Sequence, residues 1–241
     1  VPTFYYYFYS HNPWYHNMKS VYTIHNIQYQ GMYGWETNTE CIGIPQEDAA
    51  LLDMNGKVNM SKAAIETSTR VTTVSPSYAR EILDPWFAHG LDGILRERSY
   101  KLCGILNGID NDSYNPETDF HMYANYGVDN LAGKATCKQK LQERLGLEQR
   151  GDIPIISMVT RMVEHKGLDL VRMGLEEIMN ENDVQFVILG SGDKDYEDFF
   201  SYIQNKYPGR ACCCHGYIPE LARKIYAGSD IFLIIFSMVF P

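Results

Sequence analysis

The sequence has little positive charge for its length, and this excludes one large class of partner. It contains 21 Lys and Arg against 30 Asp and Glu, which gives a net charge of −9. General nucleic-acid binding needs a basic face, so we expect no nucleic-acid partner. An acidic chain can still bind a phosphorylated small molecule where a few cations gather in one cleft.

Long apolar runs and paired metal-binding cysteines are also missing. No run reaches the roughly 20 apolar residues of a membrane span, so we expect no membrane partner. The six cysteines contain no CxxC pair, and no acidic cluster suits Mg²⁺, so we expect neither metal nor cofactor. The run at 212–214 predicts a buried strand, and reduced thiols favour a cytoplasmic protein.

The second half of the chain alternates strands with helices. Continuous apolar strands separated by helices indicate a parallel sheet covered on both faces, which is an α/β fold. In the helix predicted at 167–179, Leu168, Val171, Leu175 and Ile178 have the spacing of one helical face. The predicted strands are 152–161, 184–190, 211–217 and 231–235, and the predicted helices are 167–179, 196–207 and 219–229.

The first half repeats this plan less regularly. Strands are predicted at 20–26 and 71–74, and a short apolar run at 103–110 ends in the turn signal Asn107–Gly108. The stretch "SYNPETDF" is rich in turn formers, so we divide the chain into domains 1–112 and 113–241. A helix follows at 130–146, with Leu131, Leu141 and Leu145 as its expected apolar contacts.

Polar clusters follow the predicted strands. Parallel α/β sheets bind ligands beyond the carboxyl ends of their strands, so these clusters are the candidate site residues. They are His25 with Asn26, Asn107, Thr160 with Arg161, Gly190 to Asp193 with Gly192 between them, and His215 to Tyr217 with Gly216 between them.

Several of these residues have a simpler interpretation beside the functional one. Arg161 can form paired hydrogen bonds with phosphate oxygens and Lys166 can add a point charge, but on spacing alone both are solvated loop residues. The sequence "GSGD" at 190–193 lacks the full GxGxxG and the P-loop Lys, so it equally suits a tight turn. His25 suits a general acid or base, or a structural hydrogen bond, and Tyr217 suits stacking on a base, or packing.

Taken together, long segments resemble bacterial glycogen synthase and plant starch synthase, the glucosyltransferases that extend α-1,4-glucan. The resemblance runs in family order over nearly all of residues 15–233. It is carried by "VYTIHNIQYQGMY", "RVTTVSPSYAREI", "HGLDGILRERSYKLCGILNGID", "SMVTRMVEHKGLDL", "LGSGDKDYEDFFSYIQNKYPGR" and "GYIPELARKIYAGSDIFL".

The resemblance implies a GT-B fold, in which two Rossmann-like domains with parallel sheets face a cleft, both incomplete in this chain. It implies that His25 contacts the transferred glucose, with Asn26 and Tyr29 on the acceptor side and Asn107 lining the cleft. Arg161 and Lys166 would hold the distal phosphate of the sugar nucleotide, and Tyr217 would lie against the base. Gly190, Gly192, Asp193 and Gly216 would shape the nucleotide pocket.

The chemistry implied is retaining transfer of glucose from ADP-glucose or UDP-glucose to the non-reducing end of an α-1,4-glucan. No metal is implied, so the two cations would stabilise the departing diphosphate. The expected partners are therefore a nucleotide sugar and an α-glucan polysaccharide.

The ends of the chain depart from the family pattern. The family's Lys-x-Gly-Gly loop is absent, and with one inserted residue Phe240 would fall at the position of a key glutamate. We therefore expect a partial chain that is inactive as written. Two alternatives stay open: a remnant that only binds nucleotide or glucan, and a sucrose-synthase-like GT-B enzyme. The segment "TIHNIQYQG" favours the glucan-extending group.

Overall fold

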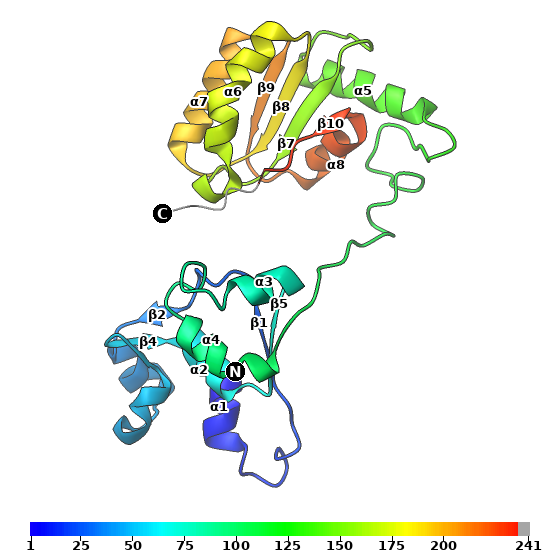
Figure 1. Ribbon diagram of the computed structural model, residues 1–241. Helices are drawn as coiled ribbons and strands as arrows, with labels where there is room; N and C mark the ends of the chain where they lie inside the picture. The colour runs from blue at the N-terminus through cyan, green and yellow to red at the C-terminus, as the bar shows by residue number, and fades with distance from the viewer. Residues whose placement is uncertain (236–241) are drawn as a thin grey trace. The chain divides into compact units, whose positions relative to one another are not determined.

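The chain folds as two compact units. A computed structural model describes residues 1–235, so Phe240 lies outside the described part (Figure 1). The first unit is Val1–Ile109 and the second begins at Asp110. The boundary expected from the sequence, between 112 and 113, is close to this division.

The first unit contains a three-stranded parallel sheet in the order β1-β5-β6. Strand β5 lies in the middle, with Val71 opposite Tyr22 on one side and Leu102 on the other. The buried core of this unit includes Ile24, Ile65 and Leu95. The three strands are β1 Val21–Ile24, β5 Arg70–Thr73 and β6 Leu102–Gly104.

A small antiparallel sheet, which the sequence analysis did not predict, lies in the same unit. Its order is β2-β4-β3, and its strands are β2 Met32–Tyr33, β3 Asp53–Met54 and β4 Lys57–Asn59. Asn59 ends this sheet and caps the next helix, because its side chain accepts a hydrogen bond from the backbone N–H of Lys62. The helices of the unit are α1 Pro2–Phe4, α2 Met60–Thr67, α3 Pro76–Glu81 and α4 Asp92–Glu97.

The second unit is built on a four-stranded parallel sheet in the order β10-β7-β8-β9. All six residues of β8 are buried, as expected for a strand covered on both faces. The strands are β7 Ile155–Val159, β8 Gln185–Gly190, β9 Ala211–His215 and β10 Ile231–Phe232. The helices are α5 Ala132–Leu145, α6 Leu168–Glu181, α7 Lys194–Lys206 and α8 Pro219–Gly228.

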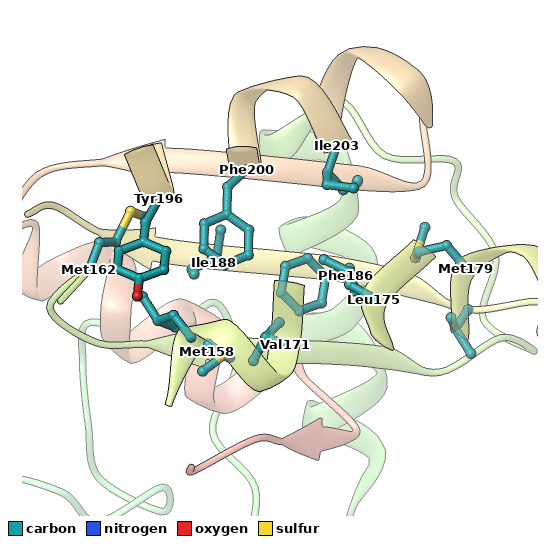
Figure 2. Close-up of a cluster of buried hydrophobic side chains, with 13 residues drawn as sticks. Met158, Met162, Val171, Leu175, Met179, Phe186, Ile188, Tyr196, Phe200 and Ile203 are labelled. Carbon is teal, nitrogen blue, oxygen red and sulfur yellow. The ribbon is translucent and has the colours of Figure 1, made fainter. Parts of the chain in front are cut away.

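Alternate side chains of β8 enter two different cores. Phe186 and Ile188 join the cluster under α6 and α7, where the Phe186 and Phe200 rings stack with centroids 6.0 Å apart (Figure 2). Val187 and Leu189 point to the opposite face and join a cluster with residues of α5 and α8. The period of two along the strand therefore produces a three-layer unit.

Two expected apolar contacts are wrong, and each has a geometric reason. Ile178 is 42% exposed, because the buried stripe of α6 steps from Leu175 to Met179, which is fully buried. Leu131 is 58% exposed, because α5 begins only at Ala132. The predicted contacts Leu141 and Leu145 do join the cluster under α5 and α8.

The cysteine run forms β9 as predicted, but its side chains are half-buried rather than buried. Among the described strands β9 pairs only with β8 and lies at an end of the sheet. A strand in that position is covered less completely than a central strand such as β8. The strand predicted at 231–235 is likewise confined to the two residues of β10.

The aromatic packing of Figure 2 predicts the effect of truncating Phe200, which is 1% exposed. Phe200→Ala should lower the free energy of unfolding by about 3–5 kcal/mol, because it removes transfer energy and leaves a cavity. Urea unfolding followed by far-ultraviolet circular dichroism measures this. Phe120→Ala is the matched control in the same unit, since Phe120 is 85% exposed. Equal losses in the two variants would contradict the prediction.

Candidate functional site

A pocket of about 250 Å³ lies where three strands of the second unit end. It is formed by the segments that follow β7, β8 and β9, together with the start of α8. The polar clusters that the sequence places after these strands therefore meet at one edge of the sheet, as the parallel order requires. The lining includes Thr160, Arg161, Gly190, Ser191, Gly216, Tyr217, Ile218, Pro219 and Ala222.

The segment after β7 lies directly against the segment after β8. The N–H of Thr160 donates to the carbonyl of Leu189 at 3.0 Å, and the N–H of Met162 donates to the carbonyl of Ser191 at 2.9 Å. The N–H of Asp193 returns a hydrogen bond to the carbonyl of Met162 at 2.7 Å. The pairing of the two strands thus continues beyond their regular ends and holds the loop that carries Arg161.

Gly190 and Gly192 make this contact possible. A Cβ added at Gly190 would lie 1.8 Å from the carbonyl oxygen of Thr160, and one at Gly192 would lie 2.2 Å from that of Met162. Both distances are far inside van der Waals contact, so a side chain at either position would push the two loops apart. The turn interpretation of "GSGD" therefore holds for these glycines, whether or not a ligand binds beside them.

Arg161 lines the pocket and contacts a residue that the sequence analysis did not select. Its Nη2 lies 3.2 Å from His165 Nε2, so a neutral His165 ring accepts a hydrogen bond from the guanidinium. Burial lowers the pKa of His165, and the cations of Arg161 and Lys166 lower it further, while Asp193 and Glu164 act in the opposite direction. The sequence could have indicated this contact, because His165 lies between the two selected cations, Arg161 and Lys166.

Lys166 shares a loop with Arg161 but occupies a different place. It is half-buried and ends a helical turn, Glu164–Lys166, which Gly167 closes with a φ of +68°. Within residues 1–235 it is not one of the residues that line the pocket. The positive charges of Arg161 and Lys166 thus both lower the pKa of His165, whereas Arg161 is the one that lies at the pocket wall.

Gly192 and Asp193 support the pocket from outside its wall. The backbone N–H of Gly192 donates to the side-chain oxygen Oε1 of Glu197 at 2.9 Å, so a carboxylate of α7 already occupies this donor. Asp193 is exposed and immediately precedes α7. In the part of the chain that the structure describes, neither residue lines the pocket.

Gly216 and Tyr217 form the wall on the β9 side. The N–H of Gly216 donates to the carbonyl of Gly190 at 2.8 Å, and its φ of +113° is a conformation that other residues rarely adopt. Tyr217 is 92% exposed, so its ring is available to a flat ligand at the edge of the pocket. The predicted residues Arg161, Gly190, Gly216 and Tyr217 are therefore brought together.

The remaining candidates, His25, Asn26, Tyr29 and Asn107, belong to the first unit. His25 follows the end of β1 and is exposed, and the side-chain oxygen of Asn26 accepts from the N–H of Gln28 at 2.9 Å. Tyr29 is 64% exposed in the same turn. Asn107 is exposed in the segment after β6. These residues follow β1 and β6, which flank β5 in one parallel sheet.

Within residues 1–235 no group of three or more His, Cys, Asp or Glu side chains is arranged to hold a metal ion. None of the described helices has the length and apolar character to cross a bilayer.

The loop contact leads to a prediction for Gly190. Gly190→Ala should destabilise the second unit by more than 1 kcal/mol, a size typical of overpacking, because its Cβ would collide with Thr160. Gly174→Ala in α6 is the control, since no described atom lies within 4 Å of a Cβ there, and it should be neutral or slightly stabilising. Urea unfolding of both variants checks this; a Gly190 variant as stable as the control would disprove it.

The contact between Arg161 and His165 leads to a prediction for pH. The folded chain holds the pKa of His165 below its ordinary value of 6.5, so the unfolded chain binds the proton more readily. As pH falls from 6.5 through that lowered pKa, the wild type should lose stability relative to His165→Gln, which cannot titrate there. Urea midpoints for both proteins across this range test it. A difference between the two that stays constant with pH would refute the prediction.

Comparison with known proteins finds relatives that are similar to nearly the whole chain. A family model described as the starch synthase catalytic domain matches residues 1–97. The chain is 46% identical over 228 residues to a glycogen synthase of Bacillus cereus (strain ATCC 10987 / NRS 248), covering 94% of this chain and 48% of that protein. It is 42% identical to the glycogen synthase of Bacillus subtilis (strain 168), covering 94% of this chain and 47% of that protein.

A solved structure extends the similarity to the fold. The catalytic domain of starch synthase IV from Arabidopsis thaliana, bound to ADP and acarbose, superposes with a TM-score of 0.88 at 32% identity. The match covers 97% of this chain and 49% of that one. The expected GT-B type α/β fold with parallel sheets is thereby confirmed. The chain spans about half the length of the relatives it matches, and over that span it is similar to the glycogen and starch synthase family.

Proposed function

We propose that the second unit is the nucleotide-sugar-binding part of a retaining glucosyltransferase that extends an α-1,4-glucan. The observation that supports this most directly is the pocket at the ends of β7, β8 and β9, with Arg161 in its wall. Glycogen synthases and a starch synthase are the relatives of the chain, which supports the same reaction.

In this proposal Arg161 takes up the charge of the departing nucleoside diphosphate. A guanidinium can donate two parallel hydrogen bonds to phosphate oxygens, and it stays charged at any physiological pH. Lys166 adds a second positive charge from the same loop. Because charge grows on the leaving diphosphate in the transition state, fixed cations lower the barrier more than they strengthen ground-state binding. The reaction then needs no metal.

The nucleotide would lie along the β8 and β9 side of the pocket. Gly190 lies in the wall there, Gly216 presents bare backbone with open space beside it, which lets a ligand approach closely, and the exposed Tyr217 ring offers a face to the base. The related starch synthase structure holds ADP. We therefore favour ADP-glucose as donor, with UDP-glucose as the alternative.

The first unit would supply the acceptor side. We propose that His25 contacts the transferred glucose, that Asn26 and Tyr29 contact the acceptor, and that Asn107 lines the cleft of the complete enzyme. The names of the relatives support a glycogen or starch chain as acceptor. A cytoplasmic location, or a plastid in a plant, completes the proposal.

ADP binding to the 241-residue chain tests the role of the two cations. Arg161→Ala should weaken binding about tenfold to a hundredfold, since hydrogen bonds to charged groups contribute about 1.5–3 kcal/mol. Lys166→Ala should weaken it as well. Isothermal titration calorimetry with ADP and with UDP measures both effects and the base preference.

Lys194→Ala is the matched control for charge. Lys194 is 82% exposed in its side chain and pairs with Asp198 on α7, so its loss removes one positive charge outside the pocket. If Lys194→Ala weakened ADP binding as much as Arg161→Ala, a general field effect would replace the proposed phosphate contact. In the complete enzyme, an Arg161→Ala variant with full turnover would refute the catalytic role.

A further inference from the structure

Strand β9 carries two thiols on one face, close together. The Sγ atoms of Cys212 and Cys214 lie 3.7 Å apart. Both side chains pack against the cluster formed with α5 and α8. Cys213 points to the other face, where its Sγ lies 3.6 Å from His215 Nε2. Alternation along the strand therefore selects one pair out of three consecutive cysteines.

The pair is accessible and is chemically asymmetric. All three cysteines are half-buried, and β9 lies at an end of the described sheet, so a small reagent can reach them. A hydrogen bond from Cys212 lowers the pKa of Cys214, and the positive charge of Arg144 on α5 lowers it further against the effect of burial. By contrast, burial raises the pKa of Cys213 to about 12. Cys214 is thus the thiol best suited to react as a thiolate.

We infer that Cys212 and Cys214 form a reversible disulfide when a low-molecular-weight disulfide oxidises them. The redox state of this pair controls the conformation of the pocket wall that follows β9. In the first step the Cys214 thiolate attacks one sulfur of the small disulfide, whose S–S bond breaks and releases one thiolate. Cys212 then loses its proton and attacks the Cys214 sulfur, which releases the second thiolate. Two protein thiols and one disulfide give one protein disulfide and two small thiols.

Closing this bond must change the strand. Residues two apart in a parallel strand are about 6.6 Å apart at Cα, near the upper limit of the usual disulfide range, whose mode is about 5.5–6 Å. The bond therefore draws the two residues together. This disturbs the pairing of β9 with β8, in which Cys212 lies opposite Val187 and Cys214 lies opposite Leu189. A strained disulfide of this kind is readily reduced again, which makes the change reversible.

The pocket lies directly along the chain from this pair. Gly216 and Tyr217 in its wall follow Cys214 after a single residue, and Gly216 is held by the carbonyl of Gly190 at 2.8 Å. Ala222 of α8 both lines the pocket and packs in the same cluster as the two cysteines. Shortening of β9 therefore changes the β9 side of the pocket in two ways. It displaces the backbone of Gly216 and Tyr217, and it changes the packing around Ala222.

Thiol trapping in the full chain tests the bond itself. The protein is equilibrated in glutathione buffers, alkylated with N-ethylmaleimide and digested with trypsin, and the peptide 211–223, which contains all three cysteines, is weighed. The wild-type peptide should carry three labels when reduced and one when oxidised. Cys213→Ser should still lose both of its labels on oxidation, without retaining glutathione. Cys214→Ser should keep both of its labels, whereas Cys212→Ser should lose only the Cys214 label and carry bound glutathione there, because the second attacking thiol is missing. Circular dichroism confirms that each variant is folded.

Hydrogen exchange tests the effect on the pocket wall. In Cys213→Ser, oxidation should speed amide exchange about tenfold in residues 212–219 and leave residues 155–159 of β7 unchanged. The inference is overturned if the folded Cys213→Ser chain stays fully labelled in a buffer that oxidises the urea-unfolded chain. Identical exchange in the oxidised and reduced forms overturns it equally. Neither measurement uses a nucleotide, so the result is independent of the proposed function.

Discussion

The candidate pocket depends on a contact between two backbones. The loop after β7 lies so close to the end of β8 and to the loop that follows it that Gly190 and Gly192 have no room for a Cβ. Three backbone hydrogen bonds join the loops, and they fix the path of the chain on both sides of Arg161. A side chain that extends from a mobile loop would pay for its ordering when it binds a ligand. Here that ordering is built into the fold, because the strand pairing of a rigid parallel sheet simply continues past the ends of β7 and β8.

Charge in this acidic chain is arranged locally, and not as a general surface property. With a net charge of −9, the molecule as a whole repels anions, yet Arg161 and Lys166 share one short loop. His165 lies between them, and burial together with their positive charge lowers its pKa, which favours the neutral ring that can accept a hydrogen bond from Arg161. The two positive charges that help to lower this pKa are the charges that an anion in the pocket would meet.

Strand β9 serves two purposes because it lies at an end of the described sheet. Its carboxyl end carries Gly216 and the exposed Tyr217 to the pocket. Its body is paired on one side only and leaves the cysteines half-buried. A central strand such as β8, with every residue buried, could not offer accessible thiols along its length.

The amino-acid sequence by itself determined the α/β alternation of the second half, because apolar periodicity reports directly which faces are buried. It also selected Arg161, Gly190, Gly216 and Tyr217, since the carboxyl ends of parallel strands meet at one edge. It did not reveal the antiparallel sheet of β2, β3 and β4, whose strands of two or three residues are too short to show a period. Only the tertiary structure decided that Gly192 and Asp193 lie behind the wall, and that the path of the loop brings His165 against Arg161. Those facts depend on how separate segments pack and on the path that a loop takes in space. No local pattern of residue types encodes either of them.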